Sequence, residues 1–261
     1  GIFARNGICM ISVSRPNFGL TSPPNDPADY EQTMLEDIAS VLDQLGTERC
    51  MIYATSTSLL DALVIARSEP RVETVLTTTP YMPHDLIAME NAKNTMYENA
   101  MVAMNRNRHI RHAAIDFFAA SYRVLGIERF LAIAYAGRRR GVEVLRRTGQ
   151  LRETEAAFEL GFADQQTFAK HEQDRNVERW SDLIHTNNTP VVIYEPNLGG
   201  WGDIAFYQRF VTERGAPYSL LKLDRNSSAH VFEFPEIFLN IILYCMKEKL
   251  ELPNDVYQFI K

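Results

Sequence analysis

Paired cysteines, long apolar runs and metal-binding histidine motifs are all missing from this sequence of 261 residues. No apolar stretch reaches the roughly 18 residues that a membrane-spanning helix requires, so we expect no insertion into a membrane. The three cysteines, Cys9, Cys50 and Cys245, form no CxxC pair and each lies in an apolar run. This usage predicts buried, reduced thiols in a cytoplasmic protein. The six histidines show no HExxH-like spacing, so a structural metal is not expected.

Positive charge is in deficit, because 27 lysines and arginines face 33 acidic residues and the net charge is −6. An acidic chain has no bulk electrostatic attraction for nucleic acid or for an anionic membrane. Arginines do cluster at 106–111 and at 138–147, but we interpret these clusters as solvated helix faces balanced by nearby glutamates. The composition therefore favours a small-molecule ligand or substrate, with no membrane partner and no nucleic acid bound through this segment.

Short β-branched runs alternate with helical periodicity in the first and last parts of the chain. We expect strands at 8–13, 50–53, 72–79, 190–194 and 218–223, and helices at 30–45, 59–66, 203–214 and 235–247. Strands that alternate with helices predict an α/β fold with a mostly parallel, doubly wound sheet and right-handed crossovers.

The middle of the chain, residues 84–180, has almost no strand signal and is rich in alanine, methionine, arginine and glutamate. We interpret it as an all-helical insertion, which leaves residues 1–83 and 181–261 as the α/β core. The aromatic residues of the insertion would line an apolar pocket beneath it or a dimer seam, so a homodimer is one expectation.

A tight turn between a strand and a helix is expected at Ala54-Thr55-Ser56-Thr57-Ser58, because CMIY precedes it and LLDALVIA follows it. Such a turn exposes a serine hydroxyl, and it needs small residues two positions before and after the serine, the usual pattern being G-x-S-x-G. Here Ala54 and Ser58 are small, but neither is glycine. The alternative interpretation is a helix-capping hydroxyl in a serine- and threonine-rich turn.

The segment from Asp37 to Pro83 resembles the nucleophile region of α/β-hydrolases. Upstream, Ser14 to Ser22 (SRPNFGLTS) looks like the family's D-R-P-G-F-G-x-S loop. Downstream, Ser228-Ala229-His230 looks like the loop that carries the catalytic histidine. The resemblance implies an α/β-hydrolase fold with a helical cap. A narrower likeness, to hydrolase-like domains of some bacterial transcription regulators, is carried by the segment Glu178-Arg179-Trp180-Ser181 before PVVIY.

This resemblance implies that Ser56 is the nucleophile and that His230 is the general base. The backbone N–H of Thr57 would donate to the oxyanion. Thr55 and His84 would contact the substrate, and no cofactor would be needed. The sequence leaves the acid open between Asp203 and Glu195, because the family's H-G-x-x-D is replaced by EPNLGG after the strand. Asp203 is equally suited to capping the next helix.

Two departures from the family bear on activity. The family's earlier strands and its His-Gly oxyanion loop have no counterpart here, so we expect the fold without its N-terminal strands. Side chains at Ala54 and Ser58 would also crowd a turn that stores strain. Two hypotheses follow from the sequence. The first is a serine esterase acting on a small apolar ester or acyl compound. The second is a non-catalytic ligand-sensing or dimerisation domain, such as one within a transcription regulator.

Overall fold

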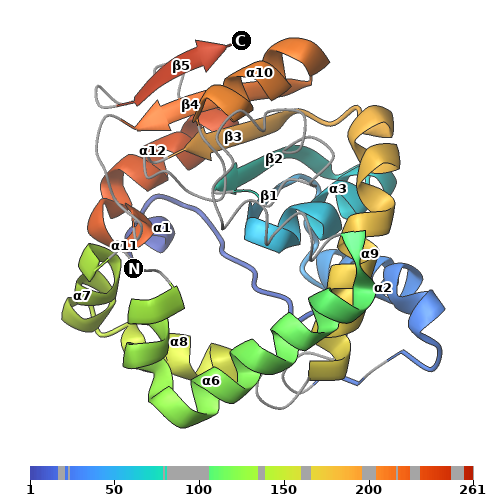
Figure 1. The fold of residues 1–261 in the computed structure, drawn as a ribbon. Helices are drawn as coiled ribbons and strands as arrows, with labels where there is room; N and C mark the ends of the chain where they lie inside the picture. The colour runs from blue at the N-terminus through green and yellow to red at the C-terminus, as the bar shows by residue number, and fades with distance from the viewer. Residues whose placement is uncertain are drawn as a thin grey trace. The chain divides into compact units, whose positions relative to one another are not determined.

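A computed structural model gives the fold of the chain (Figure 1). It describes residues 1–16, 21–22, 24–78, 80, 106–134, 139–159, 166–195, 204–215, 217–223, 230–247 and 256–260. The chain divides into two compact units, which are described separately below. Unit 1 comprises residues 1–16, 24–82 and 180–261, and unit 2 comprises residues 17–23 and 83–179.

Unit 1 contains a five-stranded sheet in the order β1-β2-β3-β4-β5, with the strands lying side by side in Figure 1. Its strands are β1 (Cys50–Thr55), β2 (Val72–Thr78), β3 (Val191–Glu195), β4 (Tyr218–Leu223) and β5 (Val256–Ile260). The first four are parallel, and β5 is antiparallel to β4. The predicted mostly parallel sheet is confirmed. The sequence analysis missed β5, although its Val-Tyr-Gln-Phe-Ile run is rich in the β-branched and aromatic residues that favour strands.

The helices of unit 1 cover both faces of this sheet, as the alternation of strands and helices predicted. They are α1 (Ile2–Arg5), the 3-10 turn η1 (Pro27–Asp29), α2 (Tyr30–Gln44), α3 (Leu59–Ser68), α10 (Ile204–Arg214), α11 (His230–Glu233) and α12 (Pro235–Cys245). Successive side chains of a strand point to opposite faces of the sheet. Leu76 of β2 lies on the face covered by α12, where it packs with Phe238 and Ile241. Val75, next to Leu76 in β2, points to the opposite face and is also fully buried. Both faces of the sheet therefore need cover, which is why its strands are nearly continuous apolar runs.

The predicted strand at Ile8–Val13 is wrong. This segment has no regular backbone pairing, and Met10 and Ile11 are 57% and 40% exposed. A strand needs a hydrogen-bonding neighbour, and within the described residues β1 pairs only with β2. For the same reason Cys9 is exposed rather than buried, whereas Cys245 is buried as expected.

Unit 2 is helical in its described parts and has its own small core. Its helices are α6 (Arg108–Ala134), α7 (Arg139–Arg147), α8 (Leu151–Phe158) and most of α9 (Gln166–Thr186). Gly126 interrupts α6 with a φ of 69°, a conformation that glycine adopts readily. Tyr122, Phe130 and Phe158 then pack ring against ring, with centroids 5.5–5.9 Å apart. No helix among the described residues is long and apolar enough to span a membrane.

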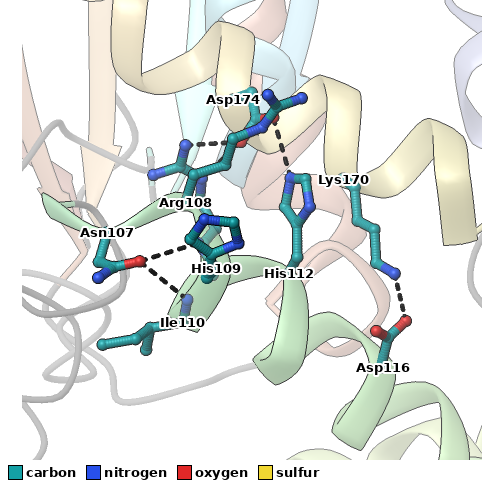
Figure 2. A network of polar contacts seen from close by, with 9 residues as sticks. Asn107, Arg108, His109, Ile110, His112, Asp116, Lys170 and Asp174 are labelled. Atoms are coloured by element: carbon teal, nitrogen blue, oxygen red, sulfur yellow. Dashed lines mark hydrogen bonds and ion pairs between the residues drawn. The ribbon is translucent and has the colours of Figure 1, made fainter.

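One carboxylate, that of Asp174 in α9, joins α9 to the first turn of α6 (Figure 2). Its oxygens accept hydrogen bonds from Arg108 Nε at 2.7 Å and Arg111 Nε at 2.8 Å, and His112 Nε2 lies at 2.9 Å. The Arg111 side chain is only 6% exposed and that of Asp174 10%. Breaking this pair would therefore remove a charged partner from a buried guanidinium, which is costly.

Replacing Asp174 by asparagine is expected to lower the unfolding free energy by about 3 kcal/mol, because the charge of Arg111 stays buried. Urea unfolding followed by circular dichroism measures the change. Asp116→Asn is the matched control, since Asp116 binds Lys170 at 2.6 Å but is 49% exposed. Loss of such an exposed pair costs less than about 1 kcal/mol. Equal losses in the two variants would contradict a buried hub at Asp174.

The effect of Asp174 also depends on pH. Burial tends to raise the pKa of this carboxyl group, but hydrogen bonds from Arg111 and His112 and their charge outweigh it and hold the pKa below its ordinary value. A lowered pKa stabilises the folded state above the ordinary pKa of about 4, and the contribution is lost as the pH falls through the folded-state value. The difference in stability between the parent and Asp174→Asn should therefore shrink below about pH 4.

Two adjacent threonines at the end of β2 differ in how their hydroxyl groups are satisfied. Thr78 Oγ1 lies 3.0 Å from the hydroxyl of Tyr53 in β1, and burial raises the pKa of that tyrosine to about 12. Thr77 is fully buried, and its Oγ1 has no hydrogen-bond partner among the residues that the structure describes. A buried hydroxyl without a partner costs free energy that a methyl group of the same shape does not.

Thr77→Val is accordingly expected to keep the fold and to raise the unfolding free energy by about 1 kcal/mol. Thr78→Val should lower it by about 1–2 kcal/mol, because it leaves the Tyr53 hydroxyl buried without its partner. Thermal and urea unfolding of both variants measure whether the unfolding free energy rises or falls in each. A Thr77→Val protein that loses as much stability as Thr78→Val would show that the Thr77 hydroxyl is satisfied in solution.

Candidate active site at the carboxyl ends of the strands

The Ser56 turn, Thr55–Ser58, connects β1 to α3. Its last three residues form the single 3-10 turn η2 (Ser56–Ser58), and α3 begins at the next residue. Every residue of α3 from Leu59 to Ala66 is buried. A helix that is apolar on all sides must be enclosed, and α3 packs on β1 and β2. Because both the strand and the helix are fixed in the core, the two ends of the turn between them are fixed as well.

A side chain closes this turn. The Ser58 hydroxyl accepts a hydrogen bond from the Thr55 N–H at 2.9 Å and donates one to the Thr55 carbonyl oxygen at 2.6 Å. The predicted crowding at the two non-glycine positions therefore has a specific form. Ala54 fits at 3% exposure, and the Ser58 side chain turns back onto the strand.

The positions of the predicted triad residues follow the parallel strands. Ser56 comes directly after β1, and His230 is the first residue of α11, after the end of β4 at Leu223. Glu195 is the last residue of β3. Carboxyl ends of parallel strands meet at one edge of a sheet, where ligands of open α/β sheets bind. The side chains of Ser56, His230 and Glu195 are outside the described part of the structure, so their mutual geometry stays a prediction.

Of the other predicted site residues, two are described by the structure and two are not. Thr55 is exposed at the end of β1, and Thr57 is half-buried in the middle of the turn. His84 and Asp203 lie outside the described residues, and their roles also stay predictions. Next to Asp203 in sequence, α10 is held by Tyr207, whose buried hydroxyl donates to the Pro80 carbonyl oxygen at 3.1 Å. This bond joins the start of α10 to the segment just past β2.

The sequence analysis missed a partly buried ion pair beside the turn. Asp61 lies in the first turn of α3 with its side chain 5% exposed, and Arg15 Nη1 binds its Oδ2 at 3.0 Å. An acidic group there also interacts favourably with the helix dipole. The signal was one aspartate in the otherwise apolar run LLDALVIA, because a buried carboxylate needs a cation or a hydrogen-bond donor. The pair therefore joins the described segment that ends at Pro16 to α3.

Comparisons with known proteins bear on the fold. No family model and no curated protein matches the chain. Solved structures do match, 147 chains in all. A malate-bound thermophilic esterase from Thermogutta terrifontis is 14% identical, with a TM-score of 0.58, over 90% of this chain and 78% of that one. The enol-lactonase from Burkholderia xenovorans LB400 is 14% identical, with a TM-score of 0.55, over 90% and 79%.

A third match is an epoxide hydrolase from Bacillus megaterium, 14% identical with a TM-score of 0.55 over 90% of this chain and 82% of that one. At this level of identity the likeness concerns the path of the backbone. It agrees with the parallel strand order, the helices on both faces and the strand–turn–helix at Ser56. The chain therefore has the α/β-hydrolase fold.

Proposed function

We propose that this chain is a serine hydrolase that cleaves a small, fairly apolar ester or related acyl compound. The observation that carries the proposal is the placement of Ser56 in a tight turn between the parallel strand β1 and the buried helix α3. A serine at such a turn presents its hydroxyl at the edge of the sheet. The esterase and the enol-lactonase among the structural neighbours support an ester or lactone as the substrate class.

In the proposed reaction the Ser56 hydroxyl attacks the acyl carbon while His230 accepts its proton. His230 then returns the proton to the leaving alcohol, and water repeats the sequence on the acyl-enzyme. The Thr57 N–H donates to the oxyanion of the tetrahedral intermediate. Asp203 or Glu195 orients the imidazole, and Thr55 and His84 contact the substrate. The helical insertion selects the acyl or alcohol part.

Labelling with a fluorophosphonate probe tests the nucleophile and the base. The parent protein should be labelled, Ser56→Ala should not, and His230→Ala should be labelled about 10²–10⁴-fold more slowly, because it lacks the general base. His185→Ala is the matched control, since His185 is exposed at the end of α9 and contacts Arg214. A well-folded parent that is not labelled would contradict the proposal and favour the non-catalytic ligand-sensing domain.

The acid is tested by comparing Asp203→Asn with Glu195→Gln. The variant that removes the orienting carboxylate should hydrolyse p-nitrophenyl butyrate about 10⁴-fold more slowly, because the imidazole then adopts the wrong tautomer. The other variant should stay close to the parent. Initial rates across the pH range, with circular dichroism as a check of folding, measure both. Parent-like rates in both variants would show that neither carboxylate completes the triad.

A further inference from the structure

The Ser58 hydroxyl makes two hydrogen bonds to one residue, and together they enclose the two residues between. It accepts from the Thr55 N–H at 2.9 Å and donates to the Thr55 carbonyl oxygen at 2.6 Å. Ser56 and Thr57 lie inside the small ring that these bonds close. The positions of the Ser56 backbone and of the Thr57 N–H therefore depend on this hydroxyl.

Ser58 does not act as an ordinary helix cap. It occupies the N-cap position of α3, where a serine hydroxyl usually accepts from an N–H of the first helical turn. Its side chain makes no such capping bond. The hydroxyl points back to the strand instead of forward to the helix, so its hydrogen bonds stabilise the turn and not the helix end.

The ends of the turn are held without Ser58. Ala54 is 3% exposed in β1, and Leu59 and Leu60 are 1% and 0% exposed in α3. Removing the Ser58 hydroxyl would leave these core contacts in place. Only the middle of the turn would become more mobile. The substitution would therefore affect the position of Ser56 and not the stability of the fold.

We propose that Ser58 is a positioning residue that holds Ser56 and the Thr57 N–H in the reactive geometry. The inference rests on the proposed roles of Ser56 and Thr57. Where the glycine of G-x-S-x-G lets strand and helix approach each other, this chain has a hydroxyl that closes the turn by hydrogen bonding. Small displacements of a nucleophile from its attack geometry cost about 10²-fold in rate.

The first measurement is the rate of fluorophosphonate labelling as a function of probe concentration. Ser58→Ala should lower the limiting rate by about 10–100-fold and leave the half-saturating probe concentration unchanged, because binding does not need the hydroxyl. Ser58→Thr keeps the hydroxyl and should recover most of the rate. Ser40→Ala is the matched control, since it removes an exposed serine hydroxyl that accepts a hydrogen bond from Gln44 in α2.

The second measurement does not depend on activity. Hydrogen exchange of the Thr55 amide, followed by NMR, should speed up by about tenfold in Ser58→Ala, because the amide loses its acceptor. Ser58→Gly is a second variant without the hydroxyl, and it should give the same faster exchange and the same slower labelling. If the Ser58→Ala protein fails to fold, Ser58→Gly is used for both measurements instead.

The outcomes separate the two proposals. A folded parent that is not labelled would overturn the serine hydrolase, while exchange at Thr55 would still show whether Ser58 closes the turn. A parent that is labelled, together with a Ser58→Ala or Ser58→Gly protein that is labelled equally fast, would overturn the positioning role alone. Slower labelling and faster exchange in these variants, with recovery in Ser58→Thr, is the expected result.

Discussion

The packing of α3 on β1 and β2 is the constraint on which the candidate site depends. Burying the apolar side chains of this helix provides the driving force, at about 25 cal/mol per Å² of apolar surface removed from water. Because Leu60 and Leu63 are fully buried, the helix axis cannot shift without opening a cavity. The chain must therefore leave β1 and enter α3 within the few residues of the Ser56 turn. The place of that turn at the end of β1 is a consequence of the core and not of the site residues themselves.

Three polar side chains near this packing are held in different ways. Asp61 is paired with Arg15, and the Tyr53 hydroxyl is paired with Thr78. The Ser58 hydroxyl is paired with the backbone of its own turn. The Asp61 carboxylate is buried, so losing its partner would leave a charge cut off from water. The Ser58 bonds are exposed, and their effect is on the turn. Arg15 thus links the segment before Pro16 to α3, Thr78 links β2 to β1, and Ser58 links the start of α3 to the end of β1.

The sequence predicts the parallel sheet well, because buried parallel strands are continuous apolar runs with a strong β-branched signal. β3 is an example, because a strand is expected over the PVVIY run at 190–194 and is observed at Val191–Glu195. The same rule fails at Ile8–Val13, which is also a largely apolar run with β-branched residues. Whether such a run becomes a strand depends on a neighbour that supplies hydrogen bonds, and composition carries no information about the neighbour. The exposure of Cys9 has the same origin.

The candidate site is only partly readable from the sequence, for a different reason. Strand and turn signals locate Ser56, because its place follows from local order along the chain. The pairing of Arg15 with Asp61 joins residues 46 positions apart, and nothing local in the sequence specifies it. The choice between Asp203 and Glu195 is also non-local, since either carboxylate would have to meet an imidazole carried by a different strand. Local patterns place single residues, whereas pairs depend on the tertiary fold.

The core determines the backbone path, and the turn determines the position of the site residues. A fold of this kind can therefore persist while its chemistry changes. The packing of α3 on the sheet needs no hydroxyl from Ser56 and no imidazole from His230, so their loss would leave the backbone path intact. The Ser58 hydrogen bonds do not serve that packing, since Ala54 and the leucines of α3 already hold both ends of the turn. Their effect is confined to the two residues between them. These bonds restrain only Ser56 and the Thr57 N–H. Such a restraint matters where a nucleophile and an oxyanion donor must act together.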